Sequence, residues 1–194
     1  MRTKHVAFLA LILLLPWLSA CTESEAWMSP VLLGGGVTAG GGCGTNFGDE
    51  SATGYTASCV TYMNSTYYVW SGGTCDMNTA CFFGSMASGS GSAKIVVYAD
   101  SAGNPTGSPL AISNVITVDS DVGQVWCGSL TSTWEITDGT YHLGALSEGG
   151  VAFTKDATSS MSDYKAFTWP NPPDPYGTKD GTIDGILQIH LEYN

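Results

Sequence analysis

The sequence has little charge, and positive charge is the scarcest. Only 12% of the 194 residues are charged, with 6 Lys and Arg against 17 Asp and Glu. Arg2 and Lys4 fall in the first 20 residues, so the rest of the chain has four lysines, no arginine and a formal net charge of −13. Such a surface cannot readily neutralise a phosphate backbone, which speaks against nucleic acid as a partner. It also opposes docking of the folded domain onto anionic lipid.

Enzyme signatures are also missing from the sequence. There is no GxSxG elbow, no HExxH motif and no phosphate-binding glycine loop in front of a helix. After residue 20 the only histidines are His142 and His190. We expect His142 to be a hydrogen-bonded histidine in a strand of the sandwich and His190 to lie on a solvated face. The 17 acidic residues single out no carboxylate pair for glycoside hydrolysis. We therefore predict no catalytic residue and a protein that is not an enzyme.

Helical periodicity is absent from every stretch of ten or more residues after residue 20. Short alternating or β-branched segments occur instead, with Gly, Pro, Asn and Asp between them at intervals of roughly eight to twelve residues. The last segment, residues 185–193, places Leu187, Ile189, Leu191 and Tyr193 on one face. The pattern predicts an all-β fold: a single jelly-roll-like antiparallel β-sandwich over residues 43–194.

The strand and turn at residues 94–110 illustrate this pattern best. Residues 94–98 are rich in β-branched and aromatic side chains, which favours a strand. Asp100, Asn104 and the glycines and prolines around them predict a long turn up to Pro109, in which both polar side chains bond their own backbone. The other predicted strands cover residues 55–63, 66–71, 79–86, 112–118, 124–130, 133–136, 141–146 and 185–193.

Residues 1–20 have the features of an export signal. Arg2 and Lys4 precede an apolar run of 13 residues at positions 6–18, which is too short to span a bilayer. The following residues, Leu18-Ser19-Ala20-Cys21, resemble the lipobox of bacterial lipoproteins. This resemblance implies cleavage before Cys21 and lipidation of its thiol. The alternative is an ordinary secretory signal that is cut after Ala20 and leaves Cys21 free or paired.

A lipidated Cys21 would make residues 21–42 a glycine-rich tether between the membrane and the domain. The expected location is then the outer membrane or the cell surface, with the domain extracellular or periplasmic. Five cysteines remain in that case, so at least one is free or bonded between chains. We expect Cys75–Cys81 as one disulfide and Cys43–Cys59 as the next, with Cys127 buried in a strand. No CxxC pair or Cys/His spacing indicates a zinc site.

Four segments carry a family resemblance: residues 94–110, 132–150, 169–178 and 186–194. In this order they resemble a poorly characterised group of jelly-roll β-sandwich domains from secreted bacterial and phage-associated proteins, which are often compared with carbohydrate-binding modules. The resemblance covers residues 59–194. Because its motifs are turn motifs, it implies a fold rather than a ligand. No catalytic residue is defined for that group.

Two groups of aromatic residues are candidates for ligand binding. Trp169 and Tyr176 bracket a proline-rich loop, and Tyr67, Tyr68 and Trp70 form a second cluster. Stiffly held aromatic rings give contact area at low entropic cost. The alternative is that such rings fill the core, as we expect for Trp126 and Trp134.

Calcium is the candidate cofactor, because it takes hard oxygen ligands from aspartates and loop carbonyls. The local clusters are Asp119 with Asp121 and Asp180 with Asp184. Neither has the full spacing of an EF-hand loop. The alternative is that both clusters are turns closed by their own side chains.

These observations predict a non-catalytic surface protein for binding or adhesion, with glycans as candidate partners. A second possibility from another class is a structural or assembly protein, such as an extracellular fibre, coat or phage-derived component. Copies would then associate through the N-terminal segment, in which residues 27–33 are apolar. A secreted glycan hydrolase is the third possibility.

Overall fold

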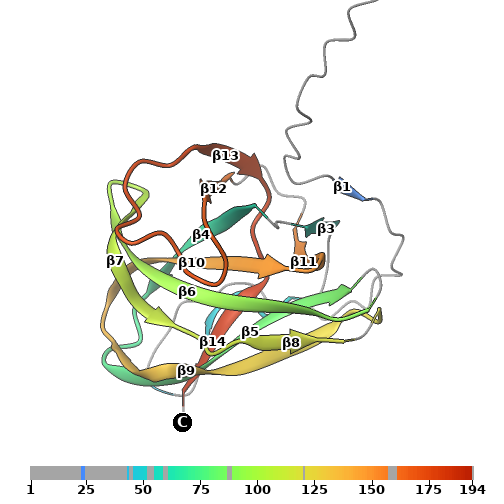
Figure 1. Cartoon of the computed structure of the whole chain (residues 1–194). Helices are drawn as coiled ribbons and strands as arrows, with labels where there is room; N and C mark the ends of the chain where they lie inside the picture. The colour runs from blue at the N-terminus through green and yellow to red at the C-terminus, as the bar shows by residue number, and fades with distance from the viewer. Residues whose placement is uncertain are drawn as a thin grey trace, which may run out of the picture.

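The computed structural model describes residues 23–24, 43, 46–51, 55–58, 61–86, 89–119, 121–156 and 161–193. These residues form an all-β fold (Figure 1). The strands are β1 (Glu23–Ser24), β2 (Phe47–Gly48), β3 (Tyr55–Ser58), β4 (Tyr62–Trp70), β5 (Cys75–Met86), β6 (Gly91–Ser101), β7 (Asn104–Ile112), β8 (Ile116–Val118), β9 (Gln124–Ile136), β10 (Gly139–Glu148), β11 (Val151–Lys155), β12 (Met161–Ala166), β13 (Gly181–Asp184) and β14 (Ile189–Tyr193). The described part of the chain contains no helix with the length and hydrophobicity that a membrane crossing requires.

Two antiparallel sheets pack face to face. Sheet A has the order β1-β3-β11-β5-β14-β2, and β9 pairs with the other edge of β5. Sheet B has the order β13-β12-β4-β10-β6-β7, and β8 also pairs with β6. Strands β3 to β6 and β9 to β11 alternate between the two sheets, and the order β3-β11-β5-β9 in sheet A corresponds to β4-β10-β6-β7 in sheet B. This interleaved order is that of a jelly roll and confirms the predicted fold class.

The main core lies between the two sheets and follows the alternation of side chains along each strand. On β6, for example, Ile95 and Val97 point inward and are fully buried. Phe47 contacts the rings of Tyr68, Trp70 and Tyr141 edge-on, with centroids 5.9–6.0 Å apart. Trp126 and Trp134 pack against this core and remain partly exposed, which agrees only in part with their predicted burial.

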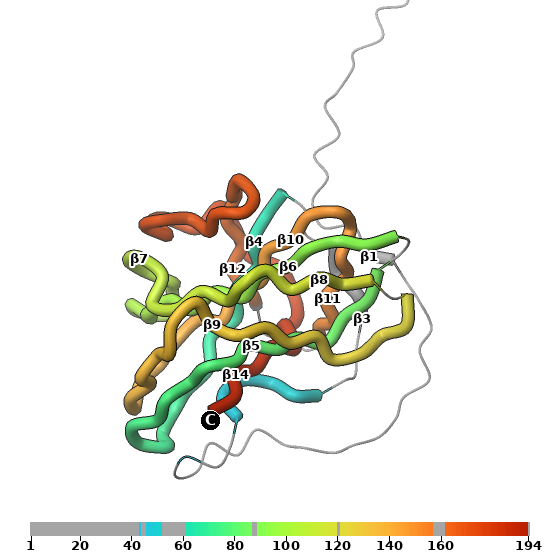
Figure 2. Tube along the Cα trace, turned by 60° about the horizontal axis from the view of Figure 1, so that its bottom comes forward, coloured from blue at the N-terminus to red at the C-terminus, as the bar shows by residue number. Residues whose placement is uncertain are grey.

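The sheets also meet along one edge, near β7, β8 and β9 (Figure 2). Ser113 and Leu130 form a bridge between the two sheets, and the Asn114 N–H donates to the Ser129 carbonyl over 2.8 Å. Backbone groups that would otherwise be unpaired at this edge are therefore partly satisfied.

The predicted long turn after residue 98 is wrong. Instead, β6 and β7 form a hairpin whose tight turn contains Ala102 and Gly103, with φ angles of 53° and 79°. Positive φ at both central positions is the geometry of a two-residue hairpin turn. Pro105 then lies within β7, which is tolerated because β7 is the last strand of the sheet B order. The predicted local bonds of Asp100 and Asn104 are present: the Gly103 N–H donates to Asp100 (3.2 Å), and the Asn104 amide donates to the Ala102 carbonyl (3.1 Å).

The predicted cysteine pairing is also wrong. The disulfides are Cys43–Cys75 and Cys81–Cys127. Cys75 and Cys81 lie six positions apart on the extended strand β5, a span of about 20 Å that no disulfide can bridge. Cys81 faces Cys127 on the neighbouring strand β9 instead. Cys59 and the predicted lipidation site Cys21 lie outside the described residues.

A second, smaller core lies on the outer face of sheet B. The segment between β12 and β13 covers Met63, Val96, Tyr98 and Leu146 with the ring of Tyr176. Trp169 packs against the same cluster and is half-buried. The proline-rich loop therefore packs on the outer face of sheet B, where it lies beside β7 (Figure 1).

Candidate functional site

The outer face of sheet B carries a row of three rings. Tyr67 on β4 lies opposite His142 on β10, and His142 lies opposite Tyr98 on β6. Facing positions on neighbouring strands project from the same side of a sheet, so the three side chains line up across it. Tyr67 is 54% exposed, and its ring centroid is 6.3 Å from that of His142.

The middle ring, His142, is held by Asp100. The His142 Nε2 lies 2.8 Å from the Asp100 Oδ1. A carboxylate only accepts hydrogen bonds, so Nε2 carries the proton of the neutral imidazole. Within the described residues His142 Nδ1 has no hydrogen-bond partner. Burial lowers the pKa of His142, and the bond to Asp100 opposes this shift only in part. The pair is therefore a neutral imidazole that donates to a partly exposed carboxylate.

The loop between β12 and β13 closes one side of this row. Tyr176 is fully buried, packs edge-on against Tyr98 with ring centroids 5.1 Å apart, and donates its backbone N–H to the Gly107 carbonyl over 2.9 Å. The Tyr98 hydroxyl donates to the Pro173 carbonyl over 2.6 Å. Burial raises the pKa of Tyr176 to about 12. Tyr176, one of the predicted ligand-binding residues, thus holds the loop in place and presents no ring surface to a ligand.

Tyr68 and Trp70 point to the opposite side of β4 from Tyr67. Both are buried between the sheets, where the Tyr68 hydroxyl donates to the Leu187 carbonyl over 2.5 Å and Trp70 Nε1 donates to the Gly73 carbonyl over 2.6 Å. Of the five predicted aromatic residues, Tyr67 is exposed and Trp169 is half-buried. Because side chains alternate between the two faces of a strand, treating residues 66–71 as one strand would have placed Tyr67 on the opposite face from Tyr68 and Trp70.

One of the two predicted calcium clusters, Asp180 with Asp184, contains a carboxylate that its own chain already engages. Asp180 is engaged by its own chain, because its Oδ2 accepts the Ala166 N–H (2.7 Å) and its Oδ1 accepts the Lys165 ammonium (3.1 Å). The backbone bond is the main reason why the pKa of Asp180 is lowered. Asp119, Asp121 and Asp184 are exposed. Over the residues described, no three of these carboxylates come together as metal ligands, and calcium binding stays a prediction.

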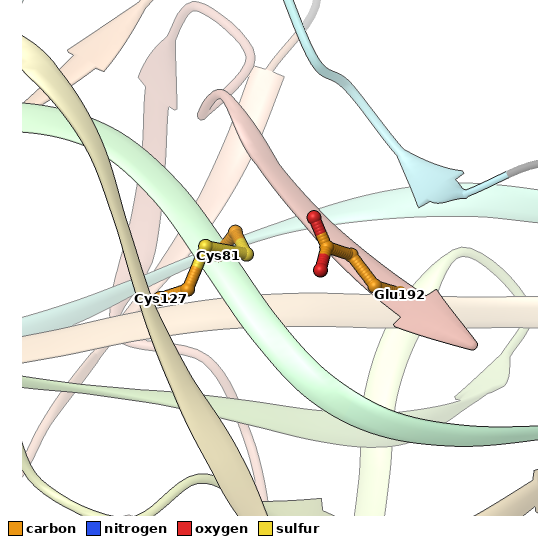
Figure 3. Close-up of side chains that lie close together, drawn as sticks. All are labelled: Cys81, Cys127 and Glu192. Atoms are coloured by element: carbon orange, nitrogen blue, oxygen red, sulfur yellow. A yellow bond between two sulfur atoms is a disulfide. The ribbon is translucent and has the colours of Figure 1, made fainter. Parts of the chain in front are cut away.

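A second cluster was missed by sequence reasoning. The sulfur atoms of Cys81 and Cys127 and a carboxylate oxygen of Glu192 lie within 4.8 Å of one another on sheet A. Figure 3 shows the carboxyl group of Glu192 directed from β14 toward the disulfide. No spacing rule could have found this cluster, because its members come from three strands that are far apart in the sequence.

We use the name Tyr67 face for the surface formed by Tyr67, Val69, Asp100, Thr140 and His142. Val69 is 56% exposed and lies opposite Thr140, so the face extends beyond His142 to the end of β4. A comparison with known protein families finds no family model that matches the chain, and no curated protein matches it.

Proposed function

We propose that this chain is a non-catalytic surface protein for binding or adhesion, and that it recognises glycans through the Tyr67 face. In this proposal the protein is exported and lipidated at Cys21. The observation that carries the proposal is the exposed ring of Tyr67 beside the Asp100–His142 pair. The two disulfides are compatible with an extracellular location.

A sugar ring has the two features that this surface can bind. Its C–H groups can pack on the face of Tyr67, while its hydroxyl groups can donate to the carboxylate of Asp100. Tyr67 and Asp100 stand on β4 and β6, which are separated by β10, and Asp100 lies two residues beyond the position in register with Tyr67, so their backbones are about 12 Å apart. The buried ring of His142 lies between these two residues, at the base of the proposed binding surface.

The Tyr67 face is also preorganised. All of its residues stand on three hydrogen-bonded strands, and His142 is fixed by Asp100. Groups on strands are positioned better than groups on loops, and a tyrosine loses little entropy when it binds. Jelly rolls also include lectin domains, so the fold is compatible with glycan binding.

A glycan array probed with the exported chain tests this function. We expect binding to a restricted set of glycans by the wild-type protein, and loss of these signals for Tyr67→Ala. An array without signals, or signals that persist in Tyr67→Ala, contradicts the proposed site. A parallel assay of newly formed reducing ends on the bound glycans should stay at background, since release of sugar would show a hydrolase instead.

A further inference from the structure

Sheet A brings four potential metal ligands onto its outer face. Cys81 on β5 lies opposite Cys127 on β9 and, along its other edge, opposite His190 on β14. Glu192 follows two residues after His190 and therefore projects from the same face. His190 is buried, although the sequence predicts a solvated face for it. The two sulfur atoms and the Glu192 carboxylate lie within 4.8 Å of one another (Figure 3), and His190 borders this group through its contact with Glu192.

One distance in this cluster already fits two ligands of a tetrahedral metal site. His190 Nε2 and Glu192 Oε1 are 3.4 Å apart. Two such atoms bound at about 2.1 Å to one Zn²⁺ in tetrahedral geometry lie about 3.4 Å apart. Two thiolates at about 2.3 Å from the same ion lie about 3.8 Å apart, so the two sulfur atoms must separate from their disulfide distance before they can bind.

We propose that reduction of the Cys81–Cys127 disulfide creates a site for a thiophilic divalent cation such as Zn²⁺. Cys81, Cys127 and Glu192 are three ligands and His190 is the fourth. The proposal is independent of glycan binding, because the site lies on the other sheet.

A dithiol reductant supplies the two electrons. Its two S–H bonds and the protein S–S bond break, two protein thiols form, and the reductant closes its own disulfide. Cys127 is exposed, which gives the reductant access, whereas Cys81 is fully buried. The cation then displaces the two thiol protons, which pass to solvent. A Cys₂HisGlu set would provide soft sulfur ligands together with nitrogen and oxygen, a mixture that suits Zn²⁺.

A cobalt titration tests this site. The complete exported chain is reduced with dithiothreitol, freed of the reagent without air, and titrated with Co²⁺ and then Zn²⁺. We expect one Co²⁺ per chain with the visible absorption of a tetrahedral thiolate site, and its displacement by Zn²⁺. The oxidised chain should bind neither ion at this site. Glu192→Gln and His190→Gln, which keep both cysteines, should each weaken binding by about tenfold or more.

Two controls separate this site from other groups. Glu148→Gln, a change at an exposed glutamate on β10, should leave the affinity unchanged. The Cys43→Ser/Cys75→Ser variant should bind the ion like the wild type. Absence of a tetrahedral Co²⁺ spectrum in the reduced chain overturns the proposal. So do unchanged affinities of Glu192→Gln and His190→Gln, or loss of the near-ultraviolet circular dichroism of the fold on reduction.

Discussion

Asp100 and His142 are joined by a 2.8 Å hydrogen bond between the neighbouring strands β6 and β10. The same aspartate accepts the N–H of Gly103 and so helps to close the hairpin turn between β6 and β7. One side chain thus has both a local structural role and a role in holding the ring that lies beneath Tyr67. A change at Asp100 should therefore affect both stability and the Tyr67 face.

Asp100→Ala should lower the free energy of unfolding by about 1–3 kcal/mol, because the buried N–H of His142 loses its charged acceptor. Asn104→Ala removes a bond in the same turn, but Asn104 is exposed. That control should change stability by less than about 0.5 kcal/mol. Urea denaturation measures both values. Equal effects of the two changes would show that the Asp100–His142 bond contributes little.

The stability of the chain should depend on pH through His142. Burial lowers its pKa in the folded state below the ordinary value of about 6.5. Between these two pKa values the unfolded chain binds more protons than the folded one, so stability falls as pH decreases through this window and is unaffected by His142 above it. His142→Gln should flatten this part of the curve. Denaturation midpoints measured from about pH 8 downward test the effect, and an unaltered slope in His142→Gln would contradict it.

Truncation should destabilise the protein much more at Tyr176 than at Tyr67. Tyr176→Ala removes a fully buried ring from the second core and should cost about 3–5 kcal/mol of stability. Tyr67→Ala removes a ring that is 54% exposed and should cost less than about 1 kcal/mol. Thermal or urea unfolding distinguishes the two. A neutral Tyr176→Ala would mean that the loop between β12 and β13 does not pack against the outer face of sheet B.

Mass spectrometry of the protein purified from its producing cells should establish the state of all six cysteines. Without reduction, peptides that contain Cys43–Cys75 and Cys81–Cys127 should remain linked. These bonds leave Cys21 and Cys59, and a lipidated Cys21 makes Cys59 the odd thiol. We therefore expect acyl chains on the Cys21 peptide and alkylation of Cys59 without prior reduction. Detection of a disulfide-linked Cys21–Cys59 peptide would contradict lipidation of Cys21 and would indicate a signal peptide that is cut after Ala20.

The fold class could be predicted because alternation and turn residues are local signals. The prediction from turn residues was wrong for the segment that follows the hairpin turn after β6. Pro105 and Gly107 are typical of loops, yet both lie in the edge strand β7. A proline is accepted there because an edge strand leaves some of its N–H groups unpaired. The local bonds of Asp100 and Asn104 were predicted correctly because these residue types are typical of turns. The same residue types carry no information about the strand after the turn, so β7 was missed.

The site depends on contacts that no local pattern encodes. Asp100 and His142 are 42 residues apart in the sequence, and only the pairing of β6 with β10 brings them together. The disulfide partners Cys81 and Cys127 are 46 residues apart for the same reason. Tyr67 was recognised as a candidate along with Tyr68 and Trp70, but the sequence does not say which face of β4 is covered. That choice depends on sheet A packing against Tyr68 and Trp70.

The most direct test of the central claim is a calorimetric titration of the bound glycan into matched tyrosine variants. Tyr67→Ala should weaken binding by about tenfold or more, because a stacking ring at the centre of a site is lost. Tyr193→Ala removes a tyrosine on sheet A that is 39% exposed, and it should bind like the wild type. Tyr67→Phe keeps the ring and should retain most of the affinity. Equal affinities of Tyr67→Ala and Tyr193→Ala would contradict glycan recognition by the Tyr67 face.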